Sequence, residues 1–243
     1  MPQAAIEAFQ KNHGLEVIHA WGMTETSPLG SISRLKSHQR ALPEAERFRI
    51  RAKQGLPVVA VDVRAMAEDG REVKWDGESM GELQVRGPWV AAGYYRDDRS
   101  SACFEDGWFK TGDIVTIDPE GFLQIADRSK DLIKSGGEWI SSVDLENRLM
   151  GHPAVQEACV VAVPHPKWSE RPLACIVPRP GAAVTKDELL DHLRPHVARW
   201  ALPDDVLFLE AIPKTSVGKF DKKVLRARFA DHVLPVTAEP PRD

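Results

Sequence analysis

The chain has 243 residues, of which 42% are hydrophobic and 28% charged, a composition typical of a folded globular protein. Its formal net charge is −4 and its isoelectric point about 6.1, which gives no reason to expect nucleic acid or an anionic membrane as a partner. The three scattered cysteines form neither a disulfide framework nor a metal-binding pair, which favours a reducing compartment. No signal-peptide pattern and no apolar run near the ~20 residues that span a bilayer are present, so a cytoplasmic location is expected.

The first sixty residues predict a helix, a strand and a connection. Residues 2–12 favour a helix, because proline suits its first position and Gly14 stands just past its end. Residues 15–18 alternate as in a strand, whereas residues 31–54 are polar and basic and are interpreted as a surface connection with a helix from Pro43. One helix and one inner strand cannot form a complete core, which suggests that they belong to a larger domain whose N-terminal part is missing.

Short strands at close spacing dominate the next part of the chain. Residues 58–65 alternate with period two, and residues 68–70 predict a hairpin turn. The further strands that the pattern predicts lie at 82–85, 114–117 and 122–125. Ahead of the second of these, residues 111–113 (Thr-Gly-Asp) are expected on a turn that presents a carboxylate. These elements together indicate a small, irregular β-barrel or sandwich.

The pattern changes after Arg128, where longer helices and apolar strands begin. The elements predicted there are a serine-capped helix through 150, strands at 155–163 and 172–178, a helix from 185 towards Trp200, a strand at 206–209 and a helix at 221–231. Thr185 and Glu188 form a capping box, and the prolines of 172–178 place that strand at a sheet edge. We therefore expect a compact α+β domain of about a hundred residues, followed by a disordered tail.

A small polar cluster, residues 21–25 (Trp-Gly-Met-Thr-Glu), follows the first predicted strand. An aromatic face for a base, a hydroxyl for a phosphate and a carboxylate for Mg²⁺ at a strand end suit a ligand site. The same residues are also consistent with a capped turn whose Trp21 lies in the core, and the motif alone leaves both interpretations open.

Three motifs further along are weaker as single signals. Residues 213–219 resemble the end of a phosphate-binding loop but lack its spacing, so Lys219 taken alone is interpreted as a solvated lysine. His192 and His196 lie four apart on a predicted helix, but no third ligand is near and a proline intervenes, so no metal site is expected.

The third of these motifs pairs Gly136 and Gly137 with Trp139. Paired glycines let another group pass close to the backbone. A flexible turn beside a packed tryptophan explains the same residues, and on its own it is the better interpretation.

Five motifs occur in order along the chain, at 21–25, 110–113, 127–132, 136–140 and 213–219. Together they strongly resemble the adenylate-forming superfamily of acyl-CoA synthetases, luciferases and peptide-synthetase adenylation domains, over nearly the whole chain. Residues 135–146 look most like the medium- and long-chain fatty acyl-CoA synthetase branch. The resemblance implies a mixed α/β fold, in which the end of the large AMP-binding domain carries a small distorted β-barrel and a small mobile α+β domain follows. The implied boundaries are 1–127, 128–233 and a tail at 234–243.

The resemblance implies a fatty acid–CoA ligase that uses ATP, Mg²⁺ and coenzyme A in two steps. A carboxylate first attacks the α-phosphate of ATP, which gives an acyl-adenylate and pyrophosphate. The thiol of coenzyme A then displaces AMP and forms a thioester.

Residue roles follow from the same resemblance. Thr24 would touch the α-phosphate, Glu25 would hold Mg²⁺, and Lys219 would bridge the carboxylate and the α-phosphate as charge builds in the transition state. Asp113, helped by Arg128, would bind the ribose hydroxyls. The full set implied to contact the nucleotide is Trp21 (against the adenine), Gly22, Thr24, Asp113, Arg128, Lys130, Lys134 and Trp139.

The resemblance also implies a moving second domain. Lys130 matches the family's hinge, about which the small domain would rotate between the two half-reactions. Gly136 and Gly137 would then line a channel for the pantetheine arm of coenzyme A.

One departure from the family is the missing Ser/Thr/Gly-rich phosphate loop, which lies upstream of the Trp-Gly-x-Thr-Glu motif in family members. The chain is therefore interpreted as the C-terminal half of a ligase that is incomplete for catalysis alone, with a missing N-terminal half in the same or a separate chain. Two alternatives stay open, a non-catalytic nucleotide- or CoA-binding partner module and a carrier-protein thiol as acceptor. The acyl chain length and the oligomeric state, including a homodimer, are not determined.

Overall fold

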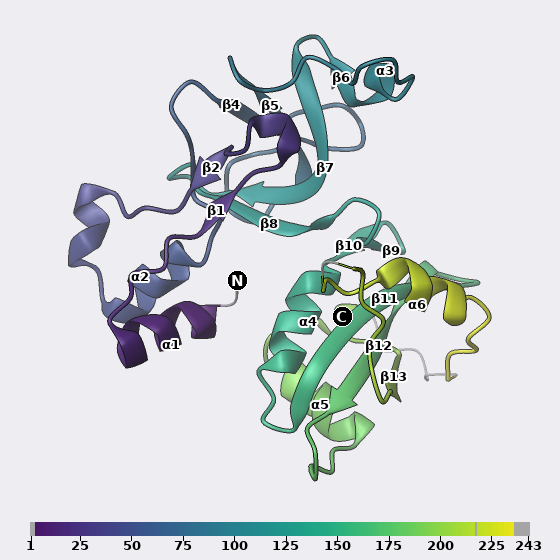
Figure 1. Ribbon diagram of the computed structural model, residues 1–243. Helices are drawn as coiled ribbons and strands as arrows, with labels where there is room; N and C mark the ends of the chain where they lie inside the picture. The colour runs from purple at the N-terminus through teal and green to yellow at the C-terminus, as the bar shows by residue number, and fades with distance from the viewer. Residues whose placement is uncertain (1–2, 217, 236–243) are drawn as a thin grey trace. The chain divides into compact units, whose positions relative to one another are not determined.

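The computed structural model describes residues 3–216 and 218–235, and the chain divides into two compact units between Ser129 and Lys130 (Figure 1). Each unit has its own buried core, and the mixed α/β fold class is confirmed by the arrangement described below. Of the predicted tail at 234–243, residues 236–243 lie outside the described residues. No helix in the described part of the chain is long and apolar enough to cross a membrane.

The first unit begins with helix α1 (Gln3–His13) and a small antiparallel sheet. That sheet has the order β1 (Ala20–Trp21), β2 (Ser31–Ile32) and β3 (Leu56–Pro57). The strand predicted at 15–18 is wrong, because the strand in this region is β1, in which Ala20 and Trp21 are the residues that pair with β2. Residues 15–18 therefore have no strand to pair with, and the Leu15 and Ile18 side chains are exposed.

The predicted surface connection at 31–54 also differs from the structure. It contains the 3₁₀ helix η2 (Ser37–Ala41) and helix α2 (Glu44–Arg51), which starts after Pro43 as expected. Phe48 and Arg51 of α2 are buried, so this segment contributes to the core rather than lying wholly on the surface.

A curled sheet of five short strands forms the rest of the first unit. Its order is β4 (Asp62–Met66), β5 (Gly81–Arg86), β7 (Trp108–Ile117) and β6 (Phe104–Glu105), with β8 (Leu123–Arg128) paired to β7 and the short helix α3 (Ser100–Cys103) before β6. All of these pairs are antiparallel. Leu83, Val85 and Val115 point into its core and are fully buried, as period-two alternation requires.

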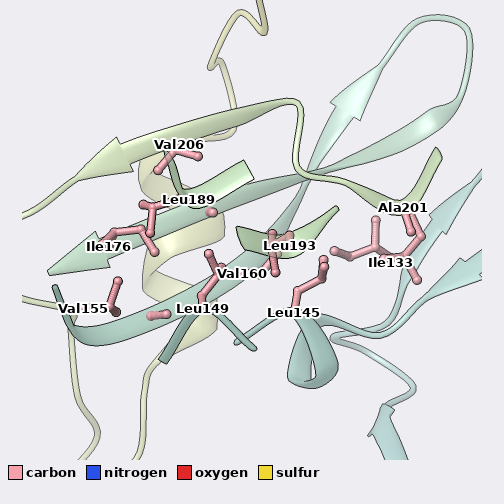
Figure 2. Close-up of a cluster of buried hydrophobic side chains, with 13 residues drawn as sticks. Ile133, Leu145, Leu149, Val155, Val160, Ile176, Leu189, Leu193, Ala201 and Val206 are labelled. Carbon is pink, nitrogen blue, oxygen red and sulfur yellow. The ribbon is translucent and has the colours of Figure 1, made fainter. Parts of the chain in front are cut away.

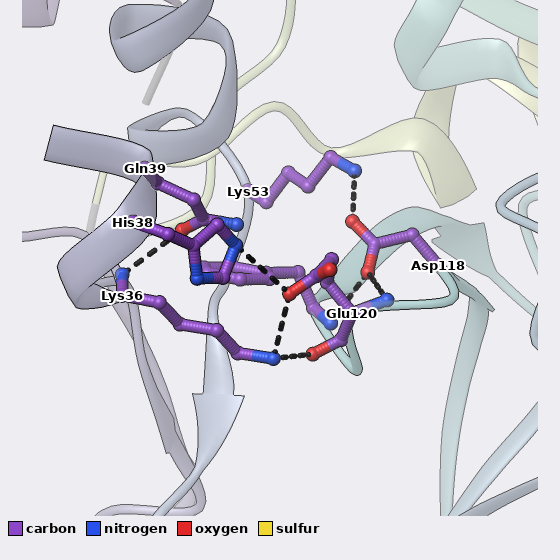
Figure 3. A network of polar contacts seen from close by, with 7 residues as sticks. Lys36, His38, Gln39, Lys53, Asp118 and Glu120 are labelled. Atoms are coloured by element: carbon purple, nitrogen blue, oxygen red, sulfur yellow. Dashed lines mark hydrogen bonds and ion pairs between the residues drawn. The ribbon is translucent and has the colours of Figure 1, made fainter. Parts of the chain in front are cut away.

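A network of charged side chains fastens the segment around η2 to the turn between β7 and β8 (Figure 3). Lys36 Nζ contacts the Glu120 carboxylate at 2.9 Å and its carbonyl at 2.6 Å, and Lys53 Nζ contacts Asp118 at 2.5 Å. The Asp118 carboxylate also accepts hydrogen bonds from the backbone N–H groups of Glu120 and Phe122. The turn is thus held by both its backbone and its side chains.

The second unit is a five-stranded sheet covered by helices on both faces. The path is β10 (Glu138–Ile140), β9 (Ile133–Ser135), β12 (Ser169–Pro178) and β11 (Val155–His165), and β13 (Asp205–Phe208) runs parallel to β12. The helices are α4 (Ser142–Met150), α5 (Lys186–Leu193), α6 (Lys222–Arg228) and the 3₁₀ turn η3 (Arg199–Ala201). Figure 2 shows the core on the α4 and α5 face, where Leu145, Leu149 and Leu189 meet the strands.

The opposite face of this sheet carries a second core under α6. Along β11, Val160 belongs to the first core, whereas Cys159 and Val161 belong to the second. Both faces of the strand are therefore buried, which explains its continuous apolar sequence. Cys159 and Cys175 are direct partners across β11 and β12, and burial raises the pKa of both thiols, that of Cys175 to about 12.

Local signals in this unit are largely confirmed, but one strand position is wrong. The Ser141 side chain caps α4, and the capping box of Thr185 and Glu188 starts α5. Strand β12 was predicted at an edge, yet it pairs with β9, β11 and β13. Pro172 has no backbone N–H to donate, but its carbonyl still accepts the N–H of Asp204 at 3.0 Å, so it can lie in an interior strand.

Helix α5 is shorter than the prediction, which extended it towards Trp200. It ends at Leu193, and η3 follows as a separate turn. Pro195 explains the early end, because Arg194 is still helical but Pro195 has no backbone N–H with which to continue the helical hydrogen bonds.

Candidate functional site

The Thr-Gly-Asp motif lies inside strand β7, not on a turn as predicted from the sequence. The register with β5 slips between Gln84↔Lys110 and Glu82↔Ile114, so three residues of β7 stand opposite Leu83. Thr111 fills the gap in the ladder, because its hydroxyl donates to the Leu83 carbonyl at 2.8 Å and accepts the Asp113 N–H at 3.1 Å. Gly112 has a φ of +70°, which glycine adopts without strain. This bulge fixes the backbone position of Asp113.

The Asp113 carboxylate joins three of the predicted site residues. One oxygen accepts the Trp21 indole N–H at 2.8 Å, and the other pairs with Arg128 Nε at 2.7 Å. The carboxylate is only 3% exposed, and burial raises its pKa, although Arg128 and Trp21 act in the opposite direction. Each carboxylate oxygen has two lone pairs, so each can accept one further hydrogen bond. Trp21 itself is buried in the core of the first unit.

The residues that follow Trp21 form a tight turn. A Cβ on Gly22 would fall 1.8 Å from the Pro28 carbonyl oxygen, so only glycine fits there. The 3₁₀ helix η1 (Thr24–Thr26) then leaves Thr24 exposed and Glu25 half-buried. A carboxylate of this kind suits Mg²⁺, which proteins hold through one or two carboxylates together with substrate phosphates.

Tyr94 is a site residue that the sequence analysis missed. Its hydroxyl donates to Glu25 Oε1 at 2.7 Å, and this hydrogen bond raises the pKa of Tyr94 to about 12. Tyr94 is one of only two tyrosines in the chain, and it stands after a glycine, but neither fact points to Glu25 69 residues away.

In the second unit the paired glycines form a two-residue hairpin between β9 and β10. Gly136 and Gly137 have φ values of +61° and +91°, and Ser135 pairs with Glu138. Positive φ at both central residues is the requirement of a type I′ turn. The Gly136 N–H donates to the Trp168 carbonyl at 2.9 Å, and a Cβ on Gly136 would fall 2.8 Å from the Trp168 ring. A Cβ on Gly137 would meet nothing within 4 Å.

The predicted nucleotide contacts Lys134 and Trp139 lie opposite each other across this hairpin. They are register partners on β9 and β10, and Lys134 Nζ lies 6.0 Å from the centre of the Trp139 ring. The buried Arg171 contacts the end of β9 beside this hairpin. It donates to Ser135 Oγ at 2.9 Å and pairs with Asp204. Arg171 was not identified from the sequence, because its partners lie more than 28 residues away in both directions.

Lys219 lies on an exposed loop that is closed by contacts between its own residues and Thr215, one of them to the Thr215 hydroxyl. Thr215 N–H donates to the Lys219 carbonyl at 2.8 Å, and Gly218 has a φ of +79°. Among the described residues, none forms an ion pair with Lys219 Nζ. The C-terminal end of the loop is anchored, since Lys222 at the start of α6 pairs with the buried Glu146 at 2.8 Å.

The predicted hinge, Lys130, lies between two anchored neighbours. Ser129 N–H donates to the Gly112 carbonyl at 2.9 Å within the first unit. Asp131 pairs with Arg226 at 2.6 Å within the second unit. Lys130 itself is exposed, so each neighbour is fixed to its own unit and the backbone of Lys130 is the link.

Among the described residues, His192 and His196 belong to no group of side chains that could hold a metal ion. His192 Nε2 lies 3.1 Å from the Arg148 carbonyl, so this nitrogen must donate a proton and cannot be a ligand. Across residues 3–216 and 218–235, no group of three or more histidine, cysteine or acidic side chains is arranged to hold a metal ion.

Comparison with known proteins places both units in one class of enzyme. Residues 1–95 match the family described as AMP-binding enzyme, and residues 144–219 match the AMP-binding enzyme C-terminal domain. The crystal structure of ATP-bound MatB from Rhodopseudomonas palustris is similar to the chain with a TM-score of 0.81 and 28% identity, over 95% of this chain and 44% of that one. The chain therefore belongs to the adenylate-forming, AMP-binding enzyme family.

Two curated relatives give the similarity in more detail. A long-chain-fatty-acid–CoA ligase of Thermus thermophilus is 51% identical over 234 residues, which cover 95% of this chain and 43% of the relative. A medium-chain-fatty-acid–CoA ligase of Ectopseudomonas oleovorans is 42% identical, over 96% of this chain and 42% of the relative. The chain thus spans less than half the length of these relatives.

Proposed function

We propose that this chain is the C-terminal portion of a fatty acid–CoA ligase, which forms an acyl-adenylate from ATP and then an acyl-CoA. The buried Asp113 carboxylate carries the proposal. A carboxylate loses favourable hydration when it is buried, and Arg128 and Trp21 compensate for this only in part, as its raised pKa shows. Two vicinal ribose hydroxyls would supply the missing donors. The names of the relatives support a medium- or long-chain fatty acid as the substrate.

In the first step, a fatty acid carboxylate oxygen bonds to the α-phosphorus of ATP, and the bond to pyrophosphate breaks. Asp113 holds the ribose, and the Thr24 hydroxyl donates to the α-phosphate. Magnesium held by Glu25 offsets the negative charge of the phosphates when it is bound. Lys219 stabilises the charge that builds on the oxygens around the α-phosphorus. The further proposed nucleotide contacts are Trp21, Gly22, Arg128, Lys130, Lys134 and Trp139.

In the second step, the sulfur of coenzyme A bonds to the acyl carbonyl carbon, AMP leaves, and the thiol proton is released. The Gly136–Gly137 hairpin has open space beside Gly137, which suits the narrow pantetheine arm. The second unit turns about Lys130 between the steps, because the residues on either side are fixed to different units.

An ATP–pyrophosphate exchange assay with a panel of fatty acids tests this proposal. The chain is measured alone and as a fusion to the upstream part of the Thermus thermophilus ligase, whose corresponding region is 51% identical. We expect no exchange from the chain alone, and fatty acid-dependent exchange followed by acyl-CoA formation from the fusion. Robust exchange by the chain alone would show that the upstream phosphate loop is not needed.

The same assay distinguishes the alternatives. A fusion that binds AMP but forms no acyl-adenylate would favour a binding module. A fusion that forms acyl-adenylate but transfers the acyl group only to a carrier-protein thiol, and not to coenzyme A, would correct the acceptor.

A further inference from the structure

Tyr94 is placed by the core of the first unit rather than by its loop. Its ring lies edge-on to Phe104, with ring centres 5.4 Å apart, and Phe104 stacks on the buried Phe109 at 4.8 Å. Phe109 lies on β7, four residues before Asp113. A column of three aromatic rings therefore connects the strand that carries the proposed ribose-binding carboxylate to Tyr94.

The backbone of Tyr94 is fixed as well. The Ser100 hydroxyl accepts the Tyr94 N–H at 2.6 Å and donates to the Tyr94 carbonyl at 3.0 Å. One side chain thus satisfies both backbone groups of the tyrosine. With the ring packed and the backbone held, the phenol oxygen has a defined position.

Two hydrogen bonds then connect this segment to Glu25. The Ala91 N–H donates to the Glu25 carbonyl at 2.8 Å, and the Tyr94 hydroxyl donates to Glu25 Oε1 at 2.7 Å. The first bond fixes the backbone and the second fixes the rotation of the carboxylate. Oε1 uses one of its two lone pairs for the phenol proton, whereas no described residue donates to Oε2, so Oε2 has more lone-pair capacity to coordinate a cation.

We infer that Tyr94 is a positioning residue, which orients the Glu25 carboxylate so that Oε2 coordinates the magnesium ion of a magnesium–nucleotide complex. This inference rests on the proposed function, in which Glu25 is the metal ligand. Hydrogen-bond partners of metal ligands fix the orientation of the ligand, and their loss typically lowers metal affinity about 10- to 100-fold.

The chain offers a closely matched control, because its only other tyrosine is the next residue. Tyr95 is 85% exposed, and Tyr95→Phe removes the same hydroxyl from a side chain without a contact to Glu25. Tyr94→Phe keeps the ring that packs on Phe104 and deletes one oxygen atom, so the first unit is expected to remain folded.

The experiment measures Mn²⁺ affinity by electron paramagnetic resonance in the presence of ATP, for the fusion protein and both variants. We expect Tyr94→Phe to weaken Mn²⁺ binding about tenfold or more, with unchanged fatty acid KM, and Tyr95→Phe to match wild type. The Mg²⁺ concentration that gives half-maximal exchange should rise by the same factor in Tyr94→Phe alone.

Equal Mn²⁺ affinity in the two variants would overturn the inference and leave the proposed function in place. A wild-type fusion that binds Mn²⁺ with ATP but shows no exchange would overturn the proposed function, while the metal titration would still test Tyr94. A wild-type fusion without any metal binding would overturn the role of Tyr94 directly, since Glu25 would then not be a ligand.

Discussion

The two groups proposed to act on the nucleotide, Asp113 in the first unit and Lys219 in the second, differ in how the fold holds them. Asp113 lies in a strand bulge, is 3% exposed and has a side-chain partner on each oxygen. Lys219 is exposed on a loop, and its ammonium group forms no ion pair with the described residues. The difference corresponds to the proposed roles. A ribose site benefits from a fixed acceptor, whereas a lysine that acts in only one of the two steps must be able to move away from the nucleotide.

The largest expected effect concerns the exposed group. Lys219→Ala in the fusion protein should lower the rate of acyl-adenylate formation about 10²- to 10³-fold, the range found when one group that stabilises a transition-state charge is removed. Thermal stability should not change, because the side chain is exposed. ATP–pyrophosphate exchange and a thermal melt measure the two quantities.

Lys214, on the same loop, is the matched control for Lys219. It already pairs with Glu157, so Lys214→Ala should leave the adenylation rate within a few-fold of wild type. If Lys214→Ala were as slow as Lys219→Ala, the effect would come from the loop and not from one ammonium group.

Substitution of the buried group should affect nucleotide binding, again without a loss of thermal stability. Asp113→Asn should weaken AMP binding about 10- to 100-fold, since charge-assisted hydrogen bonds to the ribose are lost, but it should not lower thermal stability. A carboxyl whose pKa is raised on folding stabilises the fold at low pH and loses that contribution as the pH rises through the folded pKa. At neutral pH the charged Asp113 therefore opposes folding, and the amide removes this term.

Asp118→Asn provides the comparison, because Asp118 is a half-buried carboxylate with a structural role. It pairs with Lys53 and accepts two backbone N–H groups, so this variant should lower thermal stability and leave AMP affinity unchanged. Calorimetric AMP titrations measure the affinity of both variants for AMP, and thermal melts measure their stability. A destabilised Asp113→Asn would mean that its carboxylate is structural too.

A smaller effect is expected in the glycine hairpin. Gly136→Ala and Gly137→Ala share the strain of positive φ, but only a Cβ on Gly136 would fall 2.8 Å from the Trp168 ring. Gly136→Ala should therefore lower the free energy of unfolding by about 1–3 kcal/mol more than Gly137→Ala. Urea denaturation of both variants measures the difference, and equal values would show that Trp168 moves aside.

The smallest effect is a change in titration. Tyr94→Phe should remove an absorbance change of tyrosine ionisation near pH 12, which Tyr95→Phe should retain. The pKa of Tyr94 is raised from an ordinary value of 10.0, so the stabilisation from its hydrogen bond is complete below pH 10 and is lost as the pH rises towards 12. An unchanged titration in Tyr94→Phe would mean that the hydrogen bond from the Tyr94 hydroxyl to Glu25 does not form in solution.

Features that depend on neighbouring residues could be predicted from the sequence. The caps at Ser141 and Thr185 and the continuous apolar run of β11 are set by a few residues each, so their patterns are visible locally. The family could be recognised because five short motifs occur in a fixed order.

Features that depend on distant partners could not be predicted. The Thr-Gly-Asp motif suggests a turn, and only the register with β5 makes it a bulge. The prolines of β12 suggested an edge, but its interior position depends on β9 and β13, which approach from other parts of the chain. Tyr94 and Arg171 act on residues far away in sequence, and no local pattern reports such a contact.

The cysteines have a practical consequence for testing the proposed motion of the second unit. Cys159 and Cys175 are buried thiols of raised pKa, and thiolates are the forms that react with maleimides. Cys103, in the first unit, is half-buried and stands at the end of α3. A fluorescent maleimide should therefore label this chain on the first unit only, without any substitution, and would give a reference point for measuring the proposed turning of the second unit.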